Sequence, residues 1–172
     1  QSSPTSGATF TVDNTAPILT KVTAITTPGN NTTPSFVFRT DEVGTLTTNI
    51  TQGFSTSSSV TTGSDQTVTF NTLPDGTYRN KTITVTDAAG NARSLTLDTF
   101  VIDTTSPTAA ITYSPSGPYK QNDSVTITAT FNEDMKTTPK PKIAITNPGT
   151  NNLSATEMTA TGSSKVWTYT YT

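Results

Sequence analysis

The chain has 172 residues, a formal net charge of −2, 13% charged residues, and neither histidine nor cysteine. The absence of cysteine excludes disulfides, thiolate catalysis and cysteine-ligated metals. The weak acidity leaves no basic patch for nucleic acid or anionic lipid. No apolar run approaches the ~20 residues that cross a bilayer, so we expect no membrane span.

Threonine is the most frequent residue, with 44 copies. Its β-branched side chain favours strands and its hydroxyl tolerates water, so this composition predicts an all-β protein with exposed sheets and thin cores. No segment carries a sustained apolar period of 3.6 residues, and we therefore expect no substantial helix.

In the first hundred residues, the alternation of apolar and polar side chains predicts a series of strands. Residues 1–6 are expected to be a linker, and residues 7–12 a strand that ends at Asp13. Further strands are predicted at 18–25, 35–40, 45–50, 66–70, 77–86 and 95–102, and the serine-rich span 53–65 can hide a short edge strand.

Beyond Pro107 the same alternation predicts five more strands, at 109–113, 125–131, 142–145, 154–160 and 165–171. Trp167, Tyr169 and Tyr171 share one face of the last strand. Such an aromatic stripe can stack on sugar rings, but a thin threonine-rich sheet needs apolar area. We therefore favour a buried core for this stripe.

One pattern of eight residues occurs twice. Phe10-Thr-Val-Asp13-Asn-Thr-Ala-Pro17 matches Phe100-Val-Ile-Asp103-Thr-Thr-Ser-Pro107 in residue type, 90 positions later. A period of that size fits a small β-sandwich. It predicts three parts: 1–13 is a linker plus the last strand of a preceding unit or a donor strand, 14–104 is one domain, and 105–172 is a second domain without its final strands.

Two explanations fit an incomplete second domain. The chain is either a window of a longer array, or residues 8–12 of one copy complete the second domain of the next copy by donor-strand exchange. The exchange supplies only one of the two missing strands, which favours the longer array.

Several short motifs together resemble the bacterial Ig-like domains of large surface adhesins and of prokaryotic surface-layer proteins, archaeal ones included. The motifs are Thr40-Asp-Glu-Val-Gly-Thr45, Leu73-Pro-Asp-Gly-Thr-Tyr78, Thr86-Asp-Ala-Ala-Gly-Asn91, the exit before Pro17, and Val125-Thr-Ile-Thr-Ala-Thr-Phe-Asn-Glu-Asp-Met135. The resemblance implies tandem immunoglobulin-like β-sandwiches at the cell surface, outside the cell.

The role that the resemblance implies is mechanical: a structural repeat of a surface layer or fibre, with neighbouring copies or adjacent Ig-like repeats as partners. Alternatives are an adhesin stalk, a donor-strand-exchanged filament subunit, and a carbohydrate-binding accessory module of a secreted glycosidase, which would contact surface glycans. We expect no enzyme, because the adjacent acids Asp41-Glu42 and Glu133-Asp134 would point to opposite faces of a strand.

Calcium is the cofactor that the resemblance implies, held near domain junctions by aspartates of the exits and turns. The candidate ligands are Asp13, Asp75, Asp87, Asn91 and Asp103, with Asp41 as a further candidate and Asp123, Glu133 and Asp134 as a weaker cluster. Calcium takes six to eight oxygen ligands, which loops at one pole of a sandwich can supply. The competing interpretation is that each aspartate only caps its own turn.

Six Asn-x-Ser/Thr sequons predict glycosylation in a secreted archaeal or eukaryotic chain. They begin at Asn30, Asn31, Asn49, Asn80, Asn122 and Asn152.

Overall fold

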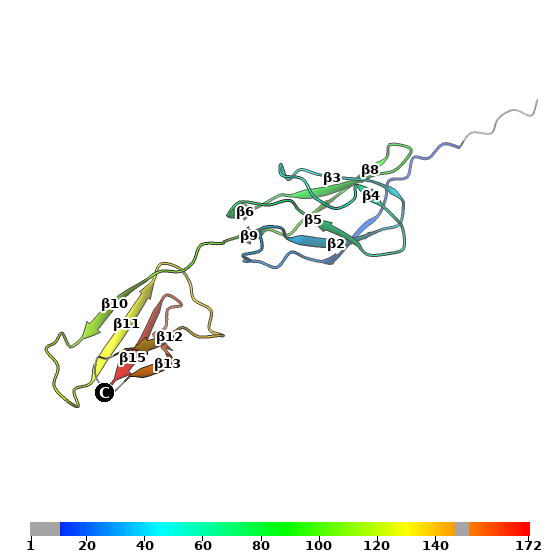
Figure 1. The fold of residues 1–172 in the computed structure, drawn as a ribbon. Helices are drawn as coiled ribbons and strands as arrows, with labels where there is room; N and C mark the ends of the chain where they lie inside the picture. Colours follow the sequence, from blue (N-terminus) through cyan, green and yellow to red (C-terminus); the bar gives the residue numbers. More distant parts are fainter. Residues whose placement is uncertain (1–10, 147–151) are drawn as a thin grey trace, which may run out of the picture. The chain divides into compact units, whose positions relative to one another are not determined.

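The computed structural model describes residues 11–146 and 152–172. The chain divides into two compact units, the first ending at Thr104 and the second beginning at Thr105. Every element among the described residues is a β-strand (Figure 1), so the prediction of an all-β, sandwich-type fold is confirmed. The predicted linker and most of the strand at 7–12 lie outside the described residues.

The first unit consists of two antiparallel sheets and a short two-stranded ladder (Figure 1). One sheet has the order β1-β2-β5: β1 (Leu19–Thr23), β2 (Ser35–Thr40) and β5 (Gln66–Thr69). The other has the order β4-β3-β7-β8: β4 (Ser59–Val60), β3 (Gly44–Thr48), β7 (Thr82–Thr86) and β8 (Ala92–Thr96). β6 (Gly76–Tyr78) pairs with β9 (Phe100–Ile102). The short β4 is the edge strand that the serine-rich span suggested.

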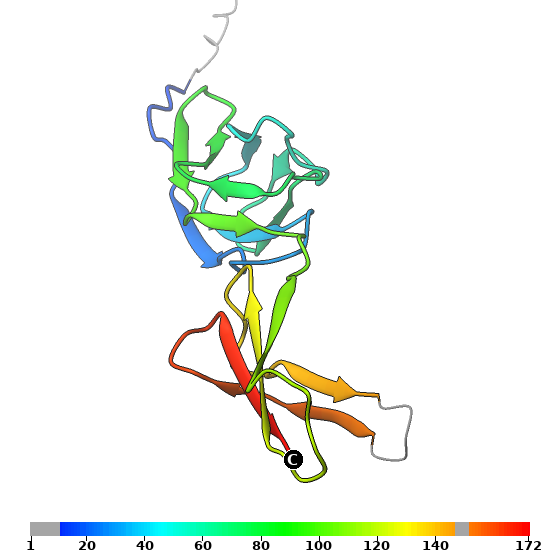
Figure 2. The ribbon, with the colours of Figure 1, turned by 90° about the vertical axis from the view of Figure 1, so that its left-hand side faces the viewer.

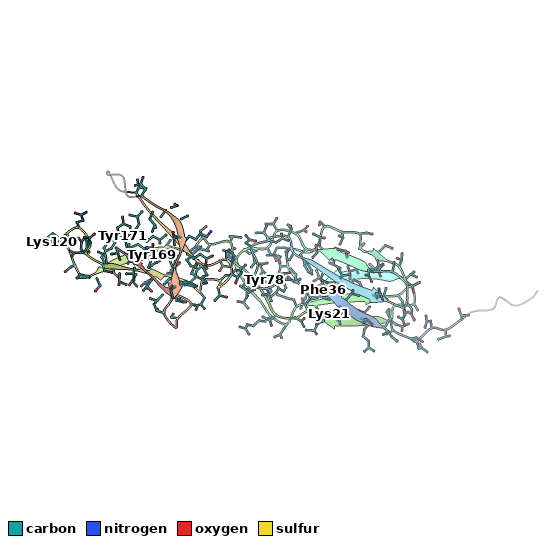
Figure 3. The ribbon with its side chains drawn as sticks, turned by 90° about the horizontal axis from the view of Figure 1, so that it is seen from below. Lys21, Phe36, Tyr78, Lys120, Tyr169 and Tyr171 are labelled. Atoms are coloured by element: carbon teal, nitrogen blue, oxygen red, sulfur yellow. The ribbon has the colours of Figure 1, made fainter. Side chains whose placement is uncertain are left out.

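The core of the first unit forms where the apolar phase of each strand faces the opposite sheet. Phe36 and Phe38 on β2, and Ile83 and Val85 on β7, are almost completely buried, and Phe36 is labelled in Figure 3. The intervening threonines of β7 keep part of their surface in water. Full burial of such a side chain contributes about 1.5–3 kcal/mol, so these two strands carry much of the stability.

Two strands that the sequence predicted as continuous are each broken. The predicted strand at 77–86 is β6 and β7, because Asn80 adopts a left-handed conformation (φ 53°) between them. The predicted strand at 95–102 is β8 and β9, since the chain turns inward at the buried Leu97, whose N–H donates to the Lys81 carbonyl (2.8 Å). The change of apolar phase near residue 99 therefore marks a change of sheet.

A tyrosine fixes the turn before β6. The Tyr78 hydroxyl donates to the Pro74 carbonyl (2.8 Å), and its ring stacks on Phe100 with the centroids 4.8 Å apart. A tyrosine that bonds back to the chain a few residues upstream is the tyrosine corner of Ig-type sandwiches.

The second unit has one four-stranded sheet and one hairpin (Figure 2). The sheet order is β10-β11-β15-β14: β10 (Ala109–Ser114), β11 (Val125–Phe131), β15 (Val166–Tyr171) and β14 (Thr159–Ala160). The hairpin is β12 (Lys142–Ile145) with β13 (Leu153–Glu157). The predicted single strand at 154–160 is therefore wrong: the chain changes sheet at the buried Met158.

The three-stranded arrangement β1-β2-β5 of the first unit recurs in the second unit as β10-β11-β15. In β2-β5, Ser35 lies opposite Thr69 and Phe36 opposite Val68. In β11-β15, Thr126 lies opposite Thr170 and Ile127 opposite Tyr169. The turn after the second strand makes the same kind of hydrogen bond in each unit. In the first unit, the Ile18 N–H donates to Asp41 Oδ1 (2.7 Å). In the second unit, the Thr108 N–H donates to Asn132 Oδ1 (2.8 Å). The 90-residue repeat thus extends to individual hydrogen bonds.

Candidate metal centre

Three carboxylates converge at one end of the first unit. Ligand oxygens of Asp13, Glu42 and Asp87 all lie within 4.8 Å of one another. Asp13 precedes β1, Glu42 lies in the turn between β2 and β3, and Asp87 directly follows β7. They line an open hollow of about 660 Å³, to which Thr11, Asp41 and Thr62 also contribute. Segments that are far apart in the sequence therefore meet at one acidic site.

The turn that carries Glu42 is fixed by its neighbours. The buried Thr40 hydroxyl donates to the Glu42 carbonyl (3.0 Å) and accepts from the Glu42 N–H (3.3 Å). Asp41 also lines the hollow, but its Oδ1 accepts a hydrogen bond from the Ile18 N–H (2.7 Å). Glu42 is therefore the acid of this turn whose carboxylate lies beside those of Asp13 and Asp87.

Gly44 allows this turn to approach the end of β7. A Cβ at position 44 would lie 2.6 Å from the Thr86 carbonyl oxygen and 2.8 Å from Val85 Cγ1. Real side chains cannot sit so close, so a glycine is needed for the close contact. This contact brings the Glu42 turn next to Asp87.

Asn91 links the Asp87 turn to the segment before β1. The Asn91 N–H donates to Asp87 Oδ1 (2.8 Å), and Asn91 Nδ2 donates to both Asp87 Oδ2 (2.9 Å) and the Asp13 carbonyl (3.1 Å). Gly90 reverses the chain with a positive φ of 96°, which glycine adopts without steric cost. Asn91 thus orients the Asp87 carboxylate and holds the Asp13 backbone beside it, while Asp13 Oδ1 accepts from the Thr15 N–H (2.9 Å).

The pKa values of Glu42 and Asp87 are shifted in opposite directions. The pKa of Glu42 is raised by desolvation and by the negative charges of Asp13, Asp41 and Asp87. The pKa of Asp87 is lowered, chiefly by the side-chain hydrogen bond from Asn91. A divalent cation would relieve the repulsion that raises the pKa of Glu42 by adding positive charge among the three carboxylates.

The acidic cluster offers oxygen donors of the kind that bind a divalent cation such as calcium. Calcium binds oxygens at 2.3–2.6 Å, so ligand atoms on opposite sides of one ion lie about 5 Å apart. The carboxylate oxygens of the three acids lie within 4.8 Å of one another, which is inside that limit. Carboxylates and backbone carbonyls are the donors that calcium prefers, and its flexible coordination accepts an irregular set of loops.

The five predicted metal ligands are divided between two places in the first unit. Asp13, Asp87 and Asn91 lie at the acidic cluster, with Asn91 in a positioning role. Asp75 and Asp103 lie at the β6-β9 ladder instead: both Asp75 oxygens accept from the Thr104 N–H (3.1 Å each), and the Asp103 N–H donates to the Gly29 carbonyl (2.9 Å). Asp75 therefore binds the segment that follows β9, 29 residues later in the chain, rather than capping its own turn.

Glu42 is the residue that sequence reasoning missed as a ligand. Asp41 was the favoured acid of that turn, and the choice between two adjacent acids depends on which one caps the neighbouring backbone. Gly44 two residues later was the available signal, because a glycine at the start of a strand indicates a close backbone approach.

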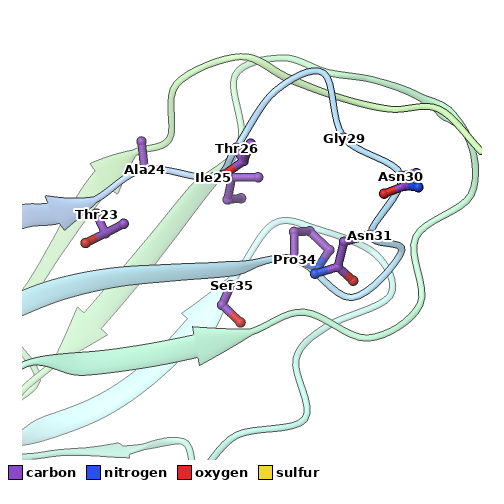
Figure 4. Close-up of a pocket in the computed structure, with 9 residues that line it drawn as sticks. All are labelled: Thr23, Ala24, Ile25, Thr26, Gly29, Asn30, Asn31, Pro34 and Ser35. Atoms are coloured by element: carbon purple, nitrogen blue, oxygen red, sulfur yellow. The ribbon is translucent and has the colours of Figure 1, made fainter. Parts of the chain in front are cut away.

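The six sequon asparagines are all exposed, but they differ in how their side chains are used. Asn49 is engaged on both sides, since its Oδ1 accepts from the Thr82 N–H (2.8 Å) and its Nδ2 donates to the Asn80 carbonyl (3.1 Å). Asn31 Oδ1 caps the Thr33 N–H (3.0 Å). Asn30 and Asn31 both line a small hollow beside β1 and β2 (Figure 4). Attachment at Asn49 would disrupt two backbone contacts.

The aromatic stripe on β15 belongs to the core. Trp167 is 1% exposed, and its Nε1 donates to the Ser164 carbonyl (2.8 Å). Tyr169 packs against the same cluster from its edge. A buried indole cannot stack on a sugar ring, so this stripe gives no support to a carbohydrate-binding module.

The strand pairing and the tyrosine corner of the first unit are those of an Ig-like β-sandwich. A family model described as a bacterial Ig-like domain matches residues 23–104, which covers most of the first unit. Glu42, Asp87 and Asn91 lie inside the matched range, and Asp13 precedes it. No curated protein and no solved structure matches the chain.

The family match supports a coarse assignment. Bacterial Ig-like domains are repeat modules of extracellular or surface proteins, and in general they are structural rather than catalytic. Among the described residues, no helix has the length and apolar character to cross a membrane.

Proposed function

We propose that this chain is a structural repeat segment of a secreted cell-surface protein that forms a surface layer or fibre, and that calcium at Asp13, Glu42 and Asp87 stiffens the approach to the first sandwich. The observation that carries the proposal is the convergence of these three carboxylates from three separate segments. A spacer that only filled distance would need no such convergence.

The mechanism is the restriction of a hinge. Asp13 belongs to the segment that enters the first sandwich, whereas Glu42 and Asp87 belong to turns of the sandwich itself. An ion bound by all three ties the entering segment to the domain and removes its freedom to swing. Adjacent repeats or neighbouring copies are then held at a defined angle, which an ordered layer or fibre requires.

Thermal unfolding in calcium and in EGTA, at matched ionic strength, tests this proposal. A ligand that binds only the folded state at 100 times its Kd stabilises it by about 2.7 kcal/mol, so we expect Tm to rise by several degrees. Glu42→Gln should abolish the rise. Asp75→Asn is the matched control and should keep it, because Asp75 lies at the β6-β9 ladder. Equal Tm values for the native chain in calcium and in EGTA would exclude the metal site.

An adhesin stalk is the second candidate function, and the acidic cluster of the first unit supports it equally. The two differ in self-association. A layer or fibre subunit assembles with its own copies at high protein concentration in calcium, whereas a stalk stays monomeric, and sedimentation velocity distinguishes them.

A further inference from the structure

One inner face of the second unit is open. Ile111 and Tyr113 on β10 are 47% and 58% exposed. They lie opposite Ala129 and Ile127 on β11, and directly opposed residues point to the same face of a sheet. Ala129 and Ile127 are buried, so the apolar side chains of β10 lie on the inner face and still contact water.

A groove of about 460 Å³ runs between this face and β12. Ile111, Tyr113 and Ile127 form one wall, and residues 142–146 form the other. Ile143 and Ile145 on β12 are only half-buried. Lys142 is the one charged residue among those that line the groove. The groove is therefore apolar and open along a strand.

In the first unit, β7 occupies the place that corresponds to this groove. β3, the strand that follows β2, pairs with β4 on one edge and with β7 on the other. Leu46 lies opposite Val85 and Thr48 opposite Ile83. Ile83 and Val85 are both 0% exposed. β7 thus fills the space between the sheets with two apolar side chains at alternate positions.

Among the described residues, the second unit has counterparts of β1, β2, β3, β4 and β5, and none of β7. β10-β11-β15 corresponds to β1-β2-β5 in strand order, and the hairpin β12-β13 corresponds to β3-β4. Within the described part of the second unit, β12 pairs only with β13, so its other edge has free N–H and C=O groups. Such an edge accepts an added strand.

We propose that this groove binds an extended segment of the β7 type, which adds as an antiparallel strand beside β12 and inserts two alternate Ile or Val side chains. The occupant is a polypeptide with the pattern Thr-Ile-Thr-Val-Thr, apolar at every second position and uncharged between them. Backbone hydrogen bonds to β12 supply affinity, and the groove selects the inserted side chains. This assembly function goes beyond a role as a spacer and does not depend on calcium.

A synthetic peptide of residues 80–98, which spans β7 and β8, tests the inference on the full chain. We expect saturable 1:1 binding and at least tenfold slower hydrogen exchange at the β12 amides. The control peptide carries Ile83→Asp and Val85→Asp and should not bind. Tyr113→Lys in the chain should weaken binding at least tenfold, and its exposed edge position leaves folding intact.

A hairpin alone is marginally stable in water, so a second version joins the same peptide to Thr172 through a Gly/Ser linker, which raises its effective concentration to the millimolar range. Slower exchange at β12 in this fusion, absent from the fusion with the Asp pair, supports the inference. Equal protection by both fusions, or none by either, overturns it. Self-association of the chain through β12 that the peptide does not compete also overturns it.

Discussion

Glu42 and Asp87 are neighbours with opposite electrostatic character. The pKa of Glu42 is raised by desolvation and by the acids around it, whereas the pKa of Asp87 is lowered by Asn91. A carboxyl with a raised folded pKa stabilises the fold below its unfolded pKa, and this contribution is lost as pH rises through the folded value. A carboxyl with a lowered pKa stabilises above its unfolded value and loses the contribution as pH falls through the folded pKa.

These signs give opposite expectations for two similar substitutions. At pH 7 in EGTA, Glu42→Gln should raise Tm by a few degrees, because it removes a charge that the folded state disfavours. Asp87→Asn should lower Tm under the same conditions, and the difference should shrink as the pH falls below the ordinary pKa of an aspartate, about 3.9. The measurement is thermal unfolding from pH 3 to pH 8. Destabilisation by Glu42→Gln at pH 7 would show that the crowding of acids has no energetic effect.

The sequence identified part of the acidic cluster. Asp13 and Asp87 could be proposed because each sits in a turn motif at the end of a strand. Asp103 has the same local motif as Asp13, yet it lies at the β6-β9 ladder of this unit. A motif indicates a turn, but which turns share one pole depends on strand direction and pairing. That information is not local, so the choice of partners, Glu42 included, required the structure.

At the scale of elements, the turn between β2 and β3 depends on Gly44. Gly44→Ala places a methyl group 2.6 Å from the Thr86 carbonyl oxygen, and overpacking of this kind costs about 1–3 kcal/mol. We expect a lower urea midpoint for the first unit and a weaker calcium response, because the Glu42 turn moves away from Asp87. Urea unfolding monitored at the Ile83 and Val85 amides measures the loss.

The control for this substitution is Thr45→Val, the next residue on the same strand. Thr45 is exposed and keeps its β-branched shape in the variant, so a change within about 0.5 kcal/mol is expected. A Gly44→Ala variant as stable as Thr45→Val would show that the two turns can separate at no cost.

Strand positions were predictable where alternation is regular and less so where the chain changes sheet. β2, β11 and β12 begin and end at the predicted residues. The predicted strands at 77–86, 95–102 and 154–160 each became two, because Asn80, Leu97 and Met158 redirect the backbone between sheets. At Met158 an apolar residue continues the pattern of a strand, so that break has no signature in the alternation, whereas the break near residue 99 coincides with a change of apolar phase.

At the scale of the whole molecule, the two units differ in how much apolar surface they bury. The main cluster of the first unit contains Phe36, Phe38, Phe70 and Phe100 among its buried members. Among the described residues of the second unit, the cluster around Trp167 includes Ala129 and Met158 as buried members, and Val125 and Ile127 are buried besides. Since burial contributes about 25 cal/mol per Å² of apolar surface, the second unit should be the less stable.

This difference can be measured because Trp167 is the single tryptophan of the chain. Its fluorescence reports the second unit, and hydrogen exchange at Phe36 and Phe38 reports the first. We expect the fluorescence transition at the lower urea concentration. Coincident transitions would mean that the open groove does not limit the stability of the second unit. Filling the groove with the fused hairpin should move the fluorescence midpoint upward.

The hydrogen bond from Asn91 to Asp13 has a consequence for mechanical load. A pull on the segment before β1 reaches the first sandwich at Asp13, through Asn91, and at Ile18, through Asp41, before it reaches the first ladder pair at Leu19. Because β1 lies antiparallel to β2, a force along β1 slides the two strands past each other and strains the bonds of the ladder together rather than one after another. The hydrogen bonds of Asn91 and Asp41 bear a small force before it reaches the β1-β2 ladder, so the sheet itself is loaded only by larger forces.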